Sequence, residues 1–219
     1  IHVTWPPEGT GAAPLAAEAV AFDVIFEDEN ILVINKPAGV VVHPTDNVHD
    51  GTLVHGLLHH DEDTFREMID ENLRPGIVHR LDKDTSGALV IAKNLEARRH
   101  LKDAFKARAV EKTYLTVVVG EFGSVTGSIE TLIGRHPRNR RKMAVVDEGG
   151  KPAVTHYRVL ASTVDVSLLE VRIETGRTHQ IRVHFAHLNH PVLGDPVYGG
   201  KQKNLGVTVE RQMLHAWKL

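Results

Sequence analysis

Short apolar runs alternate with turn-forming residues along this chain, and they predict more strands than helices. Runs rich in branched apolar residues and ended by polar or proline-containing turns are typical of buried strands. The strands expected on this basis span residues 31–34, 88–92, 114–119 and 154–160. Between Val164 and Ile173 the apolar residues alternate in one phase and then in the other, so we expect a bulge or a change of exposed face there.

Apolar residues recur at helical spacing in three other segments, each preceded by a residue that can cap a helix. The caps are Asp50 or Thr52 for a helix near 53–58, Asn94 for a helix through Arg108, and Thr178 for the last one. The expected inward-facing residues are Leu101, Ala104 and Phe105 in the second helix, and Ile181, Phe185 and Leu188 in the third. Strands outnumber helices without regular strand–helix alternation, so the predicted class is α+β with a largely antiparallel sheet.

The organisation of the chain is expected to be a linker at residues 1–20 and one globular domain at residues 21–219. Proline, glycine and alanine dominate residues 5–20, and such a composition cannot bury much apolar surface. The remaining residues are numerous enough to bury one core. The chain begins with Ile1 rather than methionine, and residues 1–3 resemble the end of a strand, so we expect a fragment of a longer protein.

Composition and charge narrow the possible chemistry. Hydrophobic residues make up 42% of the 219 residues and charged residues 25%, which is typical of globular proteins. No apolar run is long enough to favour membrane insertion, and the N-terminus does not resemble a signal peptide for export. A cytoplasmic location is therefore expected. The chain has no cysteine, which excludes disulfides, thiolate nucleophiles and cysteine-held metals. Because the net charge is −2, a nucleic-acid partner would require a local concentration of cations.

The most informative motif is His-Arg-Leu-Asp-Lys-Asp-Thr-Ser-Gly at residues 79–87, directly before the apolar run that begins at Ala88. It places charged groups at the mouth of a predicted strand. A surface turn is the ordinary interpretation of such a composition. A calcium loop opens with the same spacing of Asp, Ser and Gly, but it requires glutamate at its twelfth position, where this chain has Lys93. The calcium interpretation is therefore rejected.

As a set, these nine residues resemble the signature of the RluA/RluD family of pseudouridine synthases. The resemblance continues in the same order through residues 34–39, 42–44, 112–114, 135–137, 150–157, 174–184 and 194–199. The pattern is most similar to the members that act on large-subunit (23S) ribosomal RNA. The resemblance implies a bent, largely antiparallel sheet flanked by helices and loops, with a central active-site cleft. It also implies an S4-like RNA-binding domain before the linker and further strands after Leu219.

The resemblance implies an isomerase that converts uridine to pseudouridine without a cofactor. The reaction breaks the bond from ribose C1′ to N1, turns the uracil, and joins C5 to C1′. It needs a carboxylate that attacks the sugar or the base, or that stabilises an oxocarbenium-like ribose. Asp82 is the family's essential carboxylate, and Arg182 is assigned as the cation that favours its ionised form. Tyr114 is assigned to stack on the uracil and to remove the C5 proton. The sequence leaves the route of attack open.

The resemblance also implies how RNA is bound. The target uridine must leave its stack, at a cost of roughly a few kcal/mol, and Arg80 is expected to enter the vacated space. Further RNA contacts are expected from His79, Thr85, Arg177, His179 and Gln180. A dense cationic loop is suited to bind phosphates, although such runs are usually only solvated. Its members are Arg135, Arg138, Arg140, Arg141 and Lys142.

Two other functions stay open at this point. A non-catalytic RNA-binding or ribosome-assembly module is less favoured because every residue named for catalysis is present. A metal-dependent hydrolase is suggested by the 15 histidines, among them His55 and His59 one helical turn apart, and His184, His187 and His190 at three-residue steps. The His-Glu-x-x-His pattern is missing, so no metal is expected. The expected partner is large-subunit ribosomal RNA or a pre-ribosomal particle, bound by a monomer.

Overall fold

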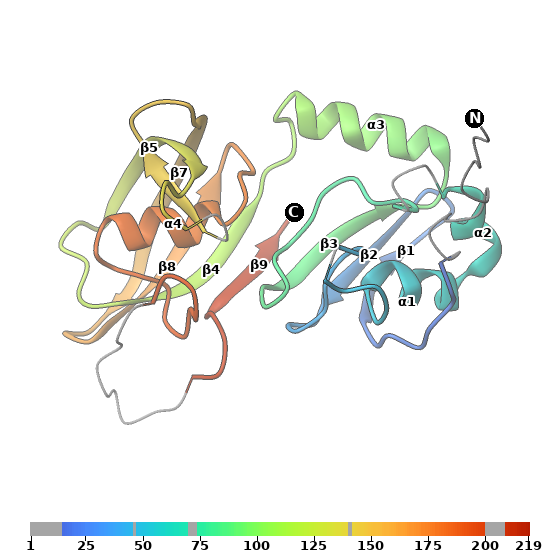
Figure 1. Ribbon diagram of the computed structural model, residues 1–219, viewed down its shortest axis with the longest axis horizontal. Helices are drawn as coiled ribbons and strands as arrows, with labels where there is room; N and C mark the ends of the chain where they lie inside the picture. Colours follow the sequence, from blue (N-terminus) through green and yellow to red (C-terminus); the bar gives the residue numbers. More distant parts are fainter. Residues whose placement is uncertain (1–14, 46, 70–73, 140–141, 200–208) are drawn as a thin grey trace, which may run out of the picture.

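The computed structural model describes residues 15–45, 47–69, 74–139, 142–199 and 209–219. In these residues nine strands form one sheet in the order β1-β2-β3-β9-β4-β8-β7-β5-β6 (Figure 1). The strands are β1 (Asp23–Glu27), β2 (Ile31–Lys36), β3 (Ser86–Ala92), β4 (Thr113–Val119), β5 (Thr126–Arg135), β6 (Met143–Val146), β7 (Lys151–Ser162), β8 (Val166–Ile173) and β9 (Leu214–Lys218). Of the strand pairs, β3 with β9 is parallel and the others are antiparallel, which confirms the α+β class and the largely antiparallel sheet.

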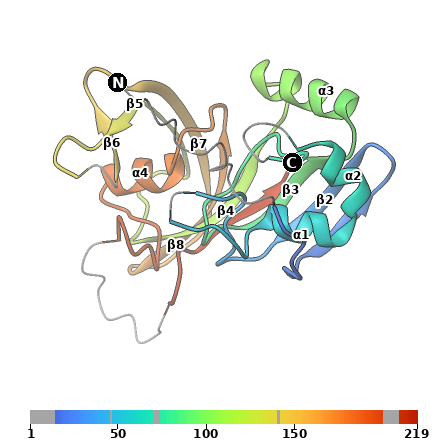
Figure 2. The same cartoon turned by 45° about the vertical axis from the view of Figure 1, so that its right-hand side comes forward.

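The sheet has two wings, which Figures 1 and 2 show from two directions. The N-terminal wing holds β1–β3 with the helices α1 (Leu53–His60), α2 (Glu62–Glu67) and α3 (Leu95–Lys106). The C-terminal wing holds β4–β8 with α4 (Gln180–His187).

Strand β9 joins the wings, because it pairs with β3 on one side and with β4 on the other. Ser86 lies opposite His215 in the parallel pair, and Tyr114 lies opposite Ala216 in the antiparallel pair. Gly87 has a φ of +115°, and a Cβ on it would lie 2.2 Å from the carbonyl oxygen of Ala216. Glycine therefore allows β9 to approach β3 directly beside the predicted catalytic motif.

Two of the predicted helix starts are confirmed. Thr52 is the N-cap of α1, and the side chain of Asn94 accepts the amide of Ala97 at 2.8 Å at the start of α3. The inward-facing residues predicted for the last helix include Ile181 and Phe185, and both are buried. Local capping and periodicity therefore determined these elements.

The predicted cap of the last helix, Thr178, is wrong. Helix α4 begins at Gln180, and His179 occupies the N-cap position in a left-handed conformation with φ 57°. The side chain of Gln180 accepts the backbone amide of Arg177 at 3.0 Å. The turn before the helix is thus closed by Gln180, so the hydroxyl of Thr178 is not needed as a cap.

The phase change predicted between Val164 and Ile173 is not found inside the strand. Strand β8 buries one face throughout, with inward residues Ser167, Leu169, Val171 and Ile173. Val164 precedes the strand and is 70% exposed, so the first apolar phase does not belong to a strand face. The irregularity lies in the partner strand β7, where the register shifts between Val159 and Ala161.

One main core runs under both wings. It includes Leu89 and Ile91 from β3, Leu169 and Val171 from β8, and Phe185 from α4. The packing of α4 against this core holds one helix of the C-terminal wing beside the mouth of β3. No helix in the described part of the chain is both long enough and apolar enough to span a membrane.

The predicted linker at 1–20 falls mostly outside the described residues, which begin at 15. From there on the chain packs against α1. Leu15 is buried in the main core, the amide of Glu18 donates to the carbonyl of His55 at 3.1 Å, and Glu18 Oε2 accepts the amide of Gly51. Residues 15–20 are therefore attached to the N-terminal wing.

Candidate active site

Asp82 lies in the loop that leads into β3, and buried contacts fix the course of this loop. Lys36, at the end of β2, is fully buried, and its ammonium donates to the carbonyls of Pro37 at 2.7 Å, Val40 at 2.8 Å and Lys83 at 3.0 Å. Burial lowers the pKa of Lys36 to about 8, against the opposing charges of Asp84 and Asp82. The ammonium thus connects two loops through their backbones and leaves the Asp82 carboxylate free of direct contact with it.

The same loop is held on its other side by the segment before β9. The Gln212 amide donates to the hydroxyl of Thr85 at 2.8 Å, and both residues are buried. The amide of Thr85 donates to the carbonyl of Asp82 at 3.1 Å, which closes a turn. Asp82 therefore sits on a loop that is attached both to the end of β2 and to the segment before the strand that joins the wings.

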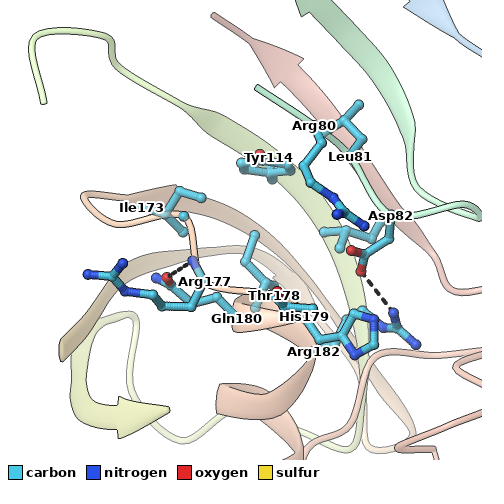
Figure 3. A pocket seen from close by; sticks show the side chains of 13 residues that line it. Arg80, Leu81, Asp82, Tyr114, Ile173, Arg177, Thr178, His179, Gln180 and Arg182 are labelled. Carbon is cyan, nitrogen blue, oxygen red and sulfur yellow. Dashed lines mark hydrogen bonds and ion pairs between the residues drawn. The ribbon is translucent and has the colours of Figure 1, made fainter. Parts of the chain in front are cut away.

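Arg182 comes from α4 on the opposite wing and reaches the Asp82 carboxylate. Its Nη1 donates to Asp82 Oδ2 at 2.8 Å (Figure 3). The Asp82 side chain is 20% exposed, and among the described residues its second oxygen, Oδ1, has no hydrogen-bond partner. One oxygen is thus held by a cation while the other stays available for chemistry.

The remaining donors of Arg182 are taken by Asp195, a residue to which the sequence assigned no role. Arg182 Nε donates to Asp195 Oδ2 at 2.7 Å and Nη2 donates to Asp195 Oδ1 at 3.0 Å. Asp195 Oδ1 also accepts the amides of Val197 at 2.8 Å and Tyr198 at 3.0 Å. The side chain of Asp195 is fully buried. Its position in the matched segment 194–199 was the available signal, but no periodicity connects it to Arg182.

The electrostatics of this trio are balanced between two carboxylates and one guanidinium. Burial works against the charge of Arg182, but the hydrogen bonds and charges of Asp195 and Asp82 outweigh it and raise its pKa. Burial likewise opposes the charge of Asp195, yet its contacts with Arg182 hold its pKa below the usual value. With all three groups ionised the trio carries a net charge of −1, so Arg182 is not an unshared cation beside Asp82.

Tyr114, on β4, closes the apolar side of the same pocket and is 9% exposed. Burial and the negative charge of Asp82 raise the pKa of Tyr114 well above its usual value. The phenol therefore stays protonated. A protonated phenol offers its ring as a stacking surface, and the role in removing the C5 proton stays a prediction.

Asp82, Tyr114 and Arg182 thus meet in one hollow between the wings, which we call the central pocket (Figure 3). It is lined by Arg80, Leu81, Asp82, Tyr114, Ile173, Gly176, Arg177, Thr178, His179, Gln180, Ile181, Arg182 and Leu214. Its walls combine apolar side chains with a few convergent charged groups, which is the usual composition of a site for a small flat ligand.

His179 and Tyr198 connect the central pocket to the β5–β6 hairpin. The Tyr198 hydroxyl accepts the amide of Met143 at 2.9 Å and lies 2.8 Å from His179 Nδ1. The Arg182 guanidinium lies over the Tyr198 ring, 5.2 Å from its centroid.

The residues predicted to contact RNA divide into two groups. Arg80 is exposed, and with Arg177 and His179 it lines the central pocket, so these three can meet a substrate. Thr85 and Gln180 are buried, and Gln180 uses its whole amide inside the protein, with Thr175, Arg177, Val154 and Thr155. We therefore reassign Thr85 and Gln180 to structural roles.

His79 also acts inside the protein. Its Nε2 accepts the amide of Val90 at 3.0 Å, and its ring stacks on Phe105 with centroids 4.6 Å apart. Burial and the charge of Lys112 lower the pKa of His79 to about 3. A neutral ring whose acceptor nitrogen is already occupied is a support for β3, so the predicted direct RNA contact is replaced by this role.

The predicted cationic loop lies at the β5–β6 hairpin, but Arg140 and Arg141 fall outside the described residues. Arg135 and Arg138 are exposed there. Lys142 folds back: its ammonium donates to the carbonyl of Val197 and lies 5.8 Å from the centroid of the Tyr198 ring. Lys142 thus ties the hairpin to the segment after Asp195.

Three of the five histidines that suggested a metal site have other partners. His55 belongs to the capping box of α1, His184 bonds the hydroxyls of Thr155 and Thr131, and the ring of His190 bonds the carbonyl of Val119. Across the described ranges, no group of three or more histidine, aspartate or glutamate side chains is placed to hold a metal ion.

The comparisons with known proteins agree with this geometry. Residues 30–187 match the family model described as RNA pseudouridylate synthase. This chain belongs to the RNA pseudouridylate synthase family. The sequence expectation of that family and fold is therefore confirmed.

Among individual proteins, the chain is 47% identical over 227 residues to ribosomal large subunit pseudouridine synthase D of Neisseria meningitidis serogroup A, covering 100% of this chain and 59% of that protein. It is 51% identical over 185 residues to the protein of the same name from Pseudomonas aeruginosa, covering 84% and 56%. The solved structure of human RNA pseudouridylate synthase domain containing 1 has a TM-score of 0.73 and 31% identity, covering 91% and 78%. The chain thus spans less than two thirds of the length of these two bacterial relatives.

Proposed function

We propose that this protein isomerises specific uridines to pseudouridine in large-subunit ribosomal RNA, with Asp82 as the essential catalytic carboxylate. The observation that carries the proposal is the asymmetry of the Asp82 carboxylate. Oδ2 is held by Arg182 while Oδ1 has no partner among the described residues, and the pocket beside it is walled by Tyr114. The ribosomal RNA substrate is taken from the names of the similar bacterial proteins.

The reaction requires that one C–N bond break and one C–C bond form at the same ribose carbon, while the base loses a proton at C5 and gains one at N1. No redox partner or group acceptor is needed. A carboxylate can attack or stabilise an electron-poor ribose or base, and a single contact with a guanidinium orients it without occupying both oxygens. The detached uracil has to stay within the pocket while it turns, and the aromatic ring of Tyr114 supplies a flat wall for it.

Arg80 has a separate role in this proposal. It is exposed at the rim of the central pocket, two residues before Asp82. Extrusion of a uridine from folded RNA costs roughly a few kcal/mol in lost stacking and pairing. A guanidinium can stack and donate hydrogen bonds at once, so Arg80 is suited to enter the space that the uridine leaves.

We extend the proposal to the setting of the reaction. The protein would act as a monomer in the cytoplasm, on ribosomal RNA or on a pre-ribosomal particle. An S4-like domain would precede the linker at residues 1–20, and further strands would follow Leu219. The relatives' greater length supports such additional segments. Their contribution would be choice of site and affinity, because Asp82, Tyr114 and Arg182 already converge within the present chain.

The test is chemical mapping of pseudouridine in unmodified large-subunit ribosomal RNA after incubation with the purified chain. We expect conversion of one or a few defined uridines. RNA that is bound but contains no pseudouridine would instead support the non-catalytic RNA-binding module. Conversion of uridines only in RNA other than large-subunit ribosomal RNA would overturn the substrate assignment and leave the catalytic proposal standing.

A further inference from the structure

A second hollow adjoins the central pocket on the side away from Asp82. We call it the lateral pocket; its argued members are His79, Phe105, Arg108, Lys112, Glu174 and Arg177. It shares Arg80, Tyr114 and Arg177 with the central pocket, so a chain-like ligand can occupy both at once. Figure 3 shows Arg177 across the central pocket from Asp82, and Arg177 also lines the lateral pocket.

The lateral pocket has an excess of positive charge. Its cationic lining residues are Arg80, Lys106, Arg108, Lys112 and Arg177, and its carboxylate is Glu174. Glu174 is already engaged, with His156 Nε2 at 2.8 Å and Arg108 Nη1 at 3.9 Å. In a chain whose formal net charge is −2, such a concentration favours an anionic ligand.

Lys112 gives the sharpest indication of that ligand. The residue is 8% exposed, yet among the described residues its ammonium makes one hydrogen bond, a long one of 3.3 Å to the carbonyl of Val110. Its other neighbour is the Phe105 ring, whose centroid lies 5.9 Å away. An ammonium has three protons to donate, and burying it without acceptors is costly. Burial and the charge of Arg108 lower the pKa of Lys112, as expected for an ammonium without a counter-charge in contact.

Arg108 lies beside Lys112 at the point where the chain leaves α3. It has a φ of 58°, in the left-handed region where helix ends usually have glycine. Its side chain is 54% exposed and reaches the rim of the pocket. Arg108 therefore offers a guanidinium from a backbone position that glycine would occupy with less strain.

The hollow on the opposite side of the central pocket is a poorer site for an anion. Its lining holds the cations Arg80, Lys83 and Arg182 together with the carboxylates of Asp82 and Asp84, a formal charge of +1 against +4 for the lateral pocket. A phosphate there would face two negative charges, whereas in the lateral pocket it would face one that is already paired.

We propose that the lateral pocket binds a phosphodiester group of the RNA strand next to the target uridine, with Lys112, Arg108 and Arg177 as donors. The identity of the ligand as RNA rests on the proposed function. The phosphate supplies the acceptors that the Lys112 ammonium lacks, and it fixes the strand so that the neighbouring uridine enters the central pocket. The stacked rings of His79 and Phe105 form the apolar floor beside the phosphate.

The first measurement is the salt dependence of RNA binding, made in the Asp82→Asn background so that the RNA stays unchanged. The probe is a short single-stranded RNA with one central uridine. Lys112→Gln should make the slope of log K against log salt shallower by about 0.7, the value for one phosphate contact on a single strand. Lys102→Gln, an exposed lysine of α3 outside the pocket, is the matched control and should leave the slope unchanged.

The second measurement locates the phosphate. Each linkage near the central uridine is replaced in turn by an uncharged methylphosphonate. At one linkage, the replacement should weaken binding by about tenfold in the protein with Lys112. The same replacement should have little further effect in Lys112→Gln, because both changes remove the same contact. Equal losses in the two proteins at every linkage, or an unchanged salt slope, would overturn the proposal. If Lys112→Gln fails to fold, Arg108→Gln, at the exposed rim of the lateral pocket, is measured instead, and the same results are expected.

Neither measurement depends on turnover, which separates this inference from the proposed function. If the loss of affinity at one linkage depends on Lys112 but the protein converts no uridine, the phosphate site stands and the isomerase activity is rejected. Conversion of uridine without any coupling would reject the phosphate site and retain the isomerase.

Discussion

The two walls of the central pocket hold their charged groups in different ways. Asp82 stands on a loop that is fixed through its backbone, because the buried ammonium of Lys36 donates to the carbonyl of Lys83 in this loop and to the carbonyls of Pro37 and Val40 in the segment after β2. Arg182 stands on a helix and is fixed through its own charge, by a two-point contact with Asp195. The first wall therefore sets where the carboxylate lies and leaves it reactive. The second wall sets how much positive charge, and in which orientation, the carboxylate meets.

The comparison predicts the largest loss when the guanidinium itself is removed. Arg182→Ala would leave Asp195 as a buried, unpaired carboxylate and would leave Asp82 without its cation. Breaking a buried ion pair from one side costs about 3–5 kcal/mol, so a lower melting temperature is expected together with a loss of conversion of at least about a thousandfold. Arg182→Lys, which keeps the charge but cannot contact both carboxylates in this geometry, should recover stability better than activity. Full activity in Arg182→Lys would contradict the orienting role.

Asp195→Asn is expected to have the next largest effect. This variant tests the orientation of Arg182 separately from its charge. The amide keeps the shape of the carboxylate but loses its charge. The guanidinium is then held less firmly and can turn a second donor toward Asp82. Occupying both oxygens of Asp82 should slow single-turnover conversion by about 10- to 100-fold while RNA affinity changes little. Asp165→Asn, an exposed aspartate in the β7–β8 turn, is the matched control. A rate equal to that of the control would show that Asp195 only supports the fold.

On the other wall, Lys36→Met should lower the stability of the fold more than it lowers the rate of conversion. Three partly buried carbonyls would lose their donor, which outweighs the relief of burying one charge less, so we expect a loss of about 2–3 kcal/mol in the free energy of unfolding. The measurement is urea denaturation at constant pH. The conversion rate at a temperature where the variant is folded should fall less than in Asp195→Asn. The reverse order would mean that the loop wall, too, acts through charge.

The smallest expected effect is a loss of stability in acid, because each wall contains a histidine that burial keeps neutral. Burial lowers the pKa of His184 to about 4, with a further effect from His187, and burial together with Lys112 lowers the pKa of His79 to about 3. The unfolded chain takes up these protons near the ordinary value of 6.5, so stability is complete above that pH and falls as pH drops toward 4. Melting temperatures between pH 7 and pH 4 should decline less steeply in His184→Gln than in the wild type. Parallel curves would contradict the assignment.

The sequence could predict the loop wall better than the helix wall. The motif at 79–87 is continuous, and local rules located the β3 strand and the cap at Asn94. Asp195, by contrast, meets Arg182 only through the folding of a loop, and Thr178 was preferred as a cap because its hydroxyl is the usual one. Strand β9 was missed because its few residues, 214–218, become a strand by insertion between β3 and β4. Long-range pairing of this kind leaves no periodic signal in a short segment.

The measurement that tests the central claim most directly is single-turnover conversion by Asp82→Asn, with RNA affinity measured on the same preparation. Asparagine keeps the size of the side chain and leaves the backbone contacts of Lys36 and Thr85 in place, so folding and binding should be preserved. The account predicts that conversion falls by at least about 10⁴-fold while the dissociation constant changes by less than about threefold. Conversion at a rate close to that of the wild type would contradict it.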